Sequence, residues 1–377
     1  MHVQTMQAVR VWDIPTRLFH WLLVLSFALA WFTHEDDRYL HIHLFAGYVF
    51  FSLLLFRLCW GFIGSYYARF SEFTYSLPHV FRYLSTLFTS ERQHYLGHNP
   101  IGGWAVFLLL CLSLGVSATG FLTQWAEEQH GLFAGWFSFA TGDLAHTGHE
   151  LLAEALLILV GVHVLGVIGE SWLQGENLIR SLFSGKKQAS IAIKTPVIPT
   201  HPYIAGFMLA GLVGASLWYF WGYFQQTADN PYIPIKNETL PRHALWEEEC
   251  GACHLAYSPV LLPARSWQLL LSQTQAHFQE DLALDADTLK QLQLFAQANA
   301  ADQHLSEAAW HIDTSTPQTD TPQRITETVY WREKHAVIPQ TYWQSALVKY
   351  QGNCAACHLD AEQGSFEDSA MSYPALP

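Results

Sequence analysis

The sequence predicts an all-α protein made of a membrane-spanning helical bundle and a separate, mostly helical polar module. Two observations favour this fold class. The chain of 377 residues is 50% hydrophobic, 15% aromatic and only 14% charged, which is unusual for a purely soluble protein. Its apolar residues gather into five long runs before residue 225, and a polar, acidic segment follows them. Helices are expected in the runs because a helix satisfies its own backbone polar groups in lipid.

Five runs are predicted to cross the bilayer, since about 20 apolar residues span its hydrocarbon core as a helix. They lie at 18–33, 41–63, 101–123, 148–172 and 201–224. The first run is not expected to be a cleaved signal peptide, because no small-residue cleavage site follows it and the acidic sequence THEDD comes directly after it.

Basic residues between the runs predict the orientation. The 34–40 and 124–147 loops together hold only Arg38, whereas nine basic residues lie in the N-terminus and the 64–100 and 173–200 loops. Those nine are Arg10, Arg17, Arg69, Arg82, Arg92, Arg180, Lys186, Lys187 and Lys194. By the positive-inside rule the N-terminus is expected in the cytoplasm of a bacterial cell, with the protein in the inner membrane and the C-terminal module in the periplasm.

The polar module is expected to be a compact domain of its own. After residue 225 the chain holds 19 acidic and 8 basic residues, so this part carries −11 of the formal net charge of −13. The segment 314–323, TSTPQTDTPQ, is predicted to be a flexible loop because of its Thr and Pro content. We therefore expect a membrane module at 1–190, a fifth helix with a tether at 191–230, and a periplasmic domain at 231–377.

Two pentapeptides in the polar module are the most specific signal. CGACH occupies 250–254 and CAACH occupies 354–358, and each is typical of covalent c-type haem attachment. Two thiols at this spacing can add to the haem vinyl groups while the adjacent histidine binds the iron. The predicted haem c residues are Cys250, Cys253, His254, Cys354, Cys357 and His358.

The remaining cysteines, Cys59 and Cys111, lie singly in predicted spans, where we expect inert buried thiols and no disulfide. For the sixth ligand of each c haem, histidine is favoured over methionine because Met371 is the only methionine of the module. The candidates are His243, His277, His304, His311 and His335, and their spacing does not choose among them.

Histidines within the spans predict two further haems of b type. His149 and His163 are fourteen residues apart, so on one helix they project from nearly the same side with about 21 Å of rise between them. Non-covalent haem needs facing imidazoles from different helices. Matching depth in the membrane pairs His149 with His43 near the outer face and His163 with His20 near the inner face, and His41 competes with His43.

Arg57 lies fourteen residues after His43 and therefore at the predicted depth of the inner haem. It is expected to pair with a haem propionate, and the alternative is an arginine that reaches the cytoplasmic interface. Glycines at 47, 115, 120 and 161 would let a haem approach the helix backbones, although glycine is common in membrane helices.

At this point the residues carry two resemblances. VRVWDIPTRLFHW, the second run and HELLAEALLILVGVHVLGVIGESWLQGENLIRSLFSG resemble the di-haem b-type cytochrome family that includes membrane subunits of nickel-iron hydrogenases and formate dehydrogenases, over about 8–190. The resemblance implies a four-helix bundle with haem ligands from the first, second and fourth helices. The matching positions are His20, His43, His149 and His163, and the family's H-x-x-x-G-Y frame selects position 43 over 41.

The polar module, over about 240–370, is similar to the di-haem cytochrome c family. In this resemblance the histidine of the sequence HF and the histidine after WREK supply the sixth ligands, which implies His277 and His335. Residues 304–318 depart from the family pattern, so His304 and His311 have no assigned role there.

These inferences together predict a membrane electron carrier with two b haems and two c haems. It would oxidise quinol from the quinone pool and reduce a periplasmic redox protein with a basic docking face, with an activity of the quinol:cytochrome c oxidoreductase type. One alternative is a membrane anchor and electron acceptor for an oxidoreductase such as a hydrogenase. Another is a haem enzyme acting on a small oxygen or nitrogen species. No nucleotide or hydrolase motif is found, and no nucleic-acid partner is expected.

Overall fold

A computed structural model of the chain divides it into two compact units. It describes residues 6–35, 39–87, 89, 93–127, 133, 136–190, 201–223, 242–304, 306–364, 366 and 370–375. Unit 1 comprises residues 1–35, 41–123 and 143–224, and unit 2 comprises 36–40, 124–142 and 225–377. The proposed domain borders near 191–200 and 230 lie outside the described residues.

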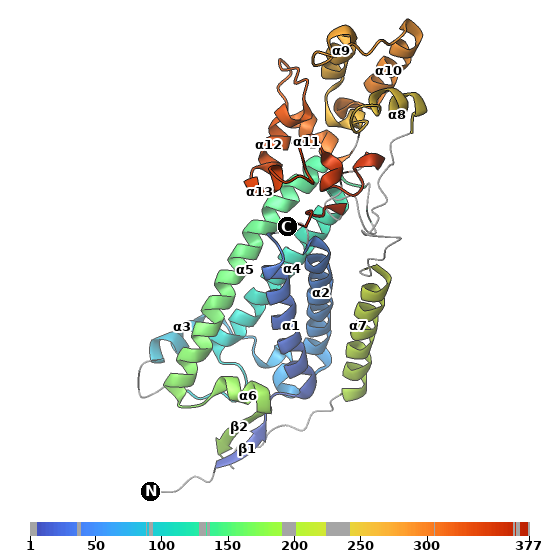
Figure 1. The fold of residues 1–377 in the computed structure, drawn as a ribbon. Helices are drawn as coiled ribbons and strands as arrows, with labels where there is room; N and C mark the ends of the chain where they lie inside the picture. The colour runs from blue at the N-terminus through green and yellow to red at the C-terminus, as the bar shows by residue number, and fades with distance from the viewer. Residues whose placement is uncertain are drawn as a thin grey trace. The chain divides into compact units, whose positions relative to one another are not determined.

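Unit 1 is built around long apolar helices (Figure 1). Among the described residues four helices are long and apolar enough to cross a membrane: α1 (Ile14–Phe32), α2 (Leu40–Ile63), α4 (Pro100–Ala126) and α5 (Phe139–Gln174). Each contains one of the first four predicted spans. Helix α1 begins earlier than its apolar run because Pro15 suits a first turn and the Asp13 carboxylate accepts the Thr16 N–H at 2.8 Å.

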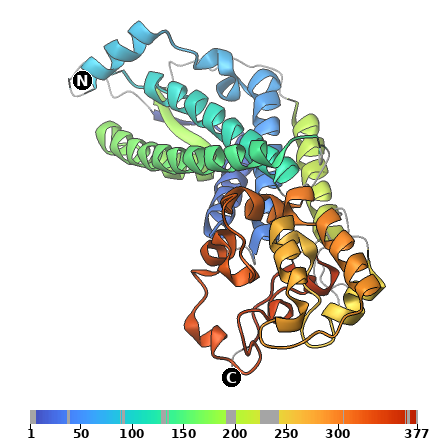
Figure 2. The ribbon, with the colours of Figure 1, turned by 90° about the horizontal axis from the view of Figure 1, so that it is seen from above.

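The interior of unit 1 consists of apolar side chains from these four helices. Leu54 of α2 and Leu156 of α5 are fully buried in one cluster with Phe50 and Leu110. Helices α4 and α5 run side by side in both ribbon views (Figures 1 and 2). This packing sets the faces on which the candidate ligands lie.

A fifth apolar helix, α7 (Pro202–Tyr223), packs against α1. Its Ala205 is completely buried in a cluster with Phe19 and Trp60. The helix coincides with the fifth predicted span, but its described apolar stretch, Tyr203–Trp218, is shorter than the four spanning helices. A fifth crossing therefore stays a prediction.

A two-stranded sheet pairs the chain before α1 with the chain after α6, and the sequence pattern does not predict it. Strand β1 (Met6–Arg10) pairs antiparallel with β2 (Lys186–Ser190), so that Ala8 lies opposite Gln188. The connecting helices of unit 1 are α3 (Leu77–Thr86), α6 (Leu178–Ser184) and the short 3₁₀ turns η2 (Tyr66–Ala68) and η3 (Phe70–Glu72).

Unit 2 is mostly helical, as the sequence predicted, and its short helices surround a core of leucine, alanine and tryptophan side chains. The helices are α8 (Ala244–Cys250), α9 (Ala264–Ser272), α10 (Ala286–Ala298), α11 (Glu307–Ser315), α12 (Val329–His335) and α13 (Gln340–Trp343). Between them lie 3₁₀ turns η4 (Pro259–Leu261), η5 (Thr274–Ala276), η6 (Ala301–Gln303), η7 (Ile325–Glu327), η8 (Cys354–Ala356) and η9 (Ala361–Gln363). Trp246, Trp267 and Leu292 form the largest buried cluster.

The predicted loop at 314–323 is partly helical and is anchored. Its first two residues, Thr314 and Ser315, end α11. Arg265 then donates to three backbone carbonyls, at 3.2 Å to Thr316, 2.9 Å to Pro317 and 2.7 Å to Asp320. The guanidinium thus satisfies acceptors that the Thr and Pro residues leave open, which the local composition did not reveal.

Candidate haem-binding sites

The structure brings the imidazole rings of His43 on α2 and His149 on α5 close together, in an edge-to-face arrangement. Their ring centroids are 6.1 Å apart with an angle of 83° between the ring planes. Each ring is held through Nδ1, which lies 2.9 Å from the Ala30 carbonyl in one case and 2.9 Å from the Val116 carbonyl in the other. With the proton on Nδ1, each ring donates to its carbonyl and keeps Nε2 as a metal ligand.

Helix α4 supports His149 although it contributes no ligand. Besides the Val116 carbonyl, Thr119 Oγ1 lies 3.3 Å from Nδ1. A Cβ on Gly120 would lie only 2.9 Å from His149 Cε1, so the ring fills the space that a side chain would need. The prediction that Gly120 leaves room for a haem is therefore wrong in detail, because the imidazole itself takes that room.

The His20 and His163 imidazoles, on α1 and α5, lie close enough to interact electrostatically. The Nδ1 atom of His20 is buried and has no hydrogen-bond partner among the described residues. Arg57 is 5% exposed, with its guanidinium carbon 4.7 Å from the centre of the Phe70 ring and 5.8 Å from that of Phe73. The arginine is thus packed between aromatic rings inside unit 1.

In unit 2 both Cys-Xaa-Xaa-Cys-His motifs face a second histidine. The rings of His254 and His277 have centroids 6.5 Å apart, and those of His335 and His358 are 6.2 Å apart. Each pair contains one of the two histidines, His277 and His335, that the family resemblance implies as sixth ligands, while the resemblance leaves open which motif each one serves. The main chain of Met371 also forms a bridge with that of His358, so the one methionine of the module lies beside the second motif.

Neighbouring groups fix the rings of the c module. His254 Nδ1 lies 2.7 Å from the Leu255 carbonyl, and its ring stacks on Tyr257 at 4.8 Å. His335 Nδ1 lies 2.8 Å from the Trp331 carbonyl, with the two rings stacked at 4.3 Å. Burial lowers the pKa of His335 to about 4, with smaller contributions from His358 and Lys334. A neutral imidazole of this kind can bind a metal.

The thiols of the motifs are also partly enclosed. Burial raises the pKa of Cys250 to about 12 and that of Cys354 to about 11, and it raises the pKa of Cys357 as well. These thiols therefore stay protonated at neutral pH as the chain stands. A thioether to a haem carries no charge and suits such an enclosed position.

The other candidate histidines of unit 2 contact groups other than the two motifs. His243 caps α8, its Nδ1 accepting the Trp246 N–H at 3.2 Å, and it packs on Phe295 at 4.5 Å. His311 stacks on Tyr330 at 4.9 Å and lies 3.9 Å from the Glu307 carboxylate. His304 follows the η6 turn. None of the three forms a close ring pair with a motif histidine in the described residues.

The two remaining cysteines differ from expectation. Cys59 and Cys111 are exposed on the bundle surface instead of buried inside it. A thiol is apolar enough to face either protein or lipid, so hydrophobicity alone could not choose the side.

The donor geometry fits a metal held between two imidazoles. Imidazole–metal bonds are about 2.0 Å, as at zinc, and each nitrogen lies about 1.1 Å from its ring centre, so two rings on one metal have centroids about 6.2 Å apart. The three ring pairs described above have centroids between 6.1 and 6.5 Å. The residues therefore fit haem ligation at these three positions.

Comparison with known proteins matches the two modules to two families. Residues 11–185 match the family described as prokaryotic cytochrome b561, and residues 246–366 match dihaem cytochrome c. Over 220 residues the chain is 29% identical to a probable Ni/Fe-hydrogenase B-type cytochrome subunit of Azotobacter vinelandii, covering 48% of this chain and 90% of that protein. The corresponding subunit of Escherichia coli K12 hydrogenase 1 is 27% identical over 210 residues, covering 46% and 88%.

Two solved structures are similar to about a third of the chain. A diheme cytochrome c from Rhodobacter sphaeroides is 40% identical and covers 34% of this chain and 99% of that one, with a TM-score of 0.30. A diheme cytochrome c from Shewanella baltica is 28% identical and covers 36% and 96%, also with a TM-score of 0.30. The chain therefore belongs to two families in succession, with a membrane b-type cytochrome of the prokaryotic cytochrome b561 family at 11–185 and a dihaem cytochrome c at 246–366.

Proposed function

We propose that this protein takes electrons from quinol in the membrane and delivers them to a periplasmic redox protein, through two b haems and two c haems. Its membership of two cytochrome families implies electron transfer. The observation that carries the finer proposal is the facing of His43 with His149, His254 with His277, and His335 with His358 at the spacing of two imidazoles on one metal.

When bound, haem supplies an iron that accepts and releases one electron. The chain's own residues would hold that iron between two neutral imidazoles, with no site left for a substrate. The carbonyls of Ala30 and Val116 orient the His43 and His149 rings, and those of Leu255 and Trp331 orient His254 and His335. Such fixed ligands favour fast electron transfer over catalysis at the metal.

Charge supports the choice of acceptor. The part of the chain after residue 225 carries a formal −11, and long-range attraction steers a basic partner onto an acidic surface. We therefore propose a soluble or peripheral periplasmic acceptor with a basic face. This assignment rests on the N-terminus lying in the cytoplasm, as the distribution of basic residues predicts.

The experiment uses the holoprotein in membranes. A quinol analogue is added, and reduction of the b and c haems is followed optically in the wild type and in His43→Ala. The c haems should be reduced in the wild type and should stay oxidised in the variant. Reduction of the c haems at the wild-type rate in a variant that lacks the b haem would exclude the pathway.

A second candidate donor follows from the relatives, which are named as hydrogenase B-type cytochrome subunits. In that case a partner enzyme would reduce the b module, and quinol would not be the donor; quinone would either be absent from the route or act as the acceptor. Purification of the protein with its bound partners distinguishes the two, because a stable hydrogenase-type subunit would be recovered only in the second case.

A further inference from the structure

A buried cation, Arg57, and a partly buried histidine, His98, both contact the Phe73 ring in unit 1. The Arg57 guanidinium lies over Phe70 and Phe73, and its Nη1 has no hydrogen-bond partner in the described part of the chain. The His98 ring packs 4.3 Å from the Phe73 ring and 5.0 Å from that of Trp12. Its Nδ1 is also buried without a partner there. Buried polar groups are rarely left unsatisfied, and a buried charge least of all.

Asp13 does not supply the missing hydrogen-bond partners of Arg57 and His98. Asp13 interacts with Arg57 electrostatically. One of its carboxylate oxygens, however, accepts the Thr16 N–H at 2.8 Å, and the other accepts Trp60 Nε1–H at 3.0 Å. Two open donors, one of them cationic, therefore remain beside Phe73.

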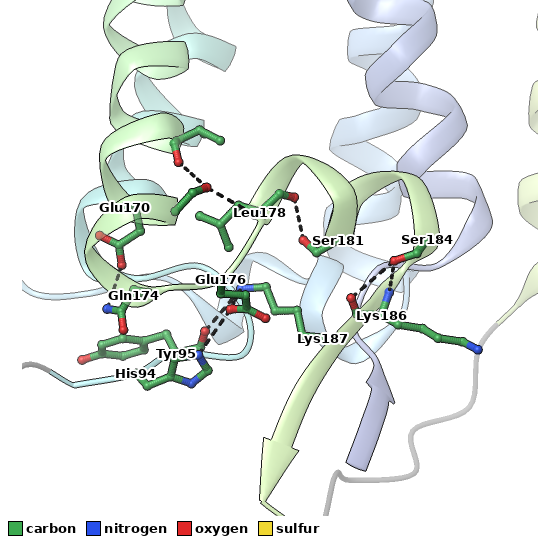
Figure 3. Close-up of polar contacts among 12 residues, drawn as sticks. His94, Tyr95, Glu170, Gln174, Glu176, Leu178, Ser181, Ser184, Lys186 and Lys187 are labelled. Carbon is green, nitrogen blue, oxygen red and sulfur yellow. Dashed lines mark hydrogen bonds and ion pairs between the residues drawn. The ribbon is translucent and has the colours of Figure 1, made fainter. Parts of the chain in front are cut away.

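The segment that carries His98 is held firmly in place (Figure 3). Lys187 is 5% exposed, and its ammonium lies 3.6 Å from the Glu176 carboxylate and 3.5 Å from the Tyr95 carbonyl. His94 lies 3.3 Å from the same carboxylate, and the Tyr75 hydroxyl donates to the His98 carbonyl at 3.0 Å. Groups from separate parts of unit 1 thus hold the main chain of the segment that carries this imidazole.

The surroundings of His98 are electropositive. The pKa of His98 is lowered to about 3, chiefly by burial and also by the nearby Arg57, Lys187 and His163. The imidazole is therefore neutral and can donate one hydrogen bond, while the nearby cations favour an anion. Arg57 lies fourteen residues after His43 on α2, at the predicted depth of the second b haem.

We propose that Arg57 and His98 together bind a propionate carboxylate of the haem held by His20 and His163. A carboxylate oxygen satisfies the open guanidinium nitrogen by a charge-assisted hydrogen bond, and its second oxygen accepts from the imidazole. This rests on the proposed haem at His20 and His163, whereas His98 itself is not a ligand of the iron. It is a positioning residue that acts through the propionate.

The test uses Arg57→Gln, His98→Phe, His98→Gln and the double variant Arg57→Gln/His98→Phe, each as purified holoprotein. The midpoint potential of each b haem is measured by optical titration. Infrared difference spectra with ¹³C-labelled haem propionates report the carboxylate directly. His79→Phe is the matched control, because its imidazole contacts the Tyr95 hydroxyl at 3.2 Å instead of the Phe73 wall.

Arg57→Gln removes a positive charge and should lower the midpoint potential of one b haem by about 59 mV, which is a tenfold change in the equilibrium constant of a one-electron reduction. His98→Phe should lower the same potential by less and shift the labelled carboxylate band, while His98→Gln, which keeps a donor, should restore both. The double variant should shift the potential by less than the sum, since both residues bind one carboxylate.

The shared site would be excluded if the potential shifts of the two single variants added up to that of the double variant, or if His98→Phe left the carboxylate band unchanged. His20→Ala separates the two proposals. If that variant keeps both b haems, the haem assignment fails, whereas a normal loss of haem in His20→Ala with no spectral change in His98→Phe refutes only this inference.

Discussion

Gly120→Ala should weaken binding of the proposed haem at His43 and His149. Gly120 lies on α4, which carries no proposed haem ligand, but its new side chain would press on the His149 ring. The new Cβ would lie 2.9 Å from His149 Cε1 and 3.1 Å from Nδ1, whereas ordinary contact begins at 3.4 Å. The ring must therefore move by about 0.5 Å or tilt, which strains its 2.9 Å hydrogen bond to the Val116 carbonyl. Overpacking of this kind costs about 1–3 kcal/mol.

If that cost falls on the haem-bound state, haem binding should weaken by about 5- to 150-fold, since about 1.4 kcal/mol is a factor of ten. The assay mixes the purified protein with an excess of apomyoglobin and follows loss of b haem optically. Gly148→Ala is the control, because its Cβ would meet Thr119 Cγ2 at 3.8 Å, an ordinary contact, beside the same histidine. Equal rates of haem loss in the two variants would refute the reasoning.

Four further predictions concern the b-haem ligands, the dihaem module and the acceptor. His43→Ala should lose one b haem while His41→Ala keeps both, as counted by pyridine haemochrome, and a full complement in His43→Ala would disprove the pairing. His335→Ala should remove the sixth ligand of one c haem and give high-spin optical bands. If Met371 replaces the histidine, a methionine-to-iron band should appear that the wild type lacks. The same band in the wild type would exclude two-histidine ligation. Tyr257→Phe removes a 2.8 Å hydrogen bond to the Gly352 carbonyl and should lower the free energy of unfolding by about 1 kcal/mol, so an unchanged denaturation midpoint would show the bond to be unimportant. Electron transfer to a basic cytochrome should slow as salt rises, and a flat salt series would remove the steering argument.

The sequence located the four spanning helices because twenty apolar residues in succession have few alternatives to a membrane helix. Helix α5 nevertheless begins at Phe139, well before its apolar run at 148, since Thr141 and Asp143 continue the helix without contributing to hydropathy. Pattern alone also left His41 and His43 open. The structure turns His43 toward His149, in agreement with the family frame.

Features that depend on long-range contacts could not be read from local pattern. Gly120 acts on His149 across a helix interface, and Lys187 pairs with Glu176 only because α6 brings the chain back. The sequence places Lys187 in a basic loop that predicts the orientation in the membrane, and the adjacent residues in the sequence do not predict that its side chain is buried. In the same way, Arg265 anchors carbonyls more than fifty residues away.

The pairing of β1 with β2 brings the beginning and the end of the b-type segment together. The strands lie just outside the two ends of the segment that matches cytochrome b561, residues 11–185, so that they tie its beginning to its end. A segment with adjoining ends can be inserted, extended or circularly permuted with little disturbance to its interior. We expect a chain stopped after Tyr223, which keeps α7 and its packing on α1, to assemble a b-type cytochrome by itself, and other redox domains could follow the same helix in place of the dihaem extension.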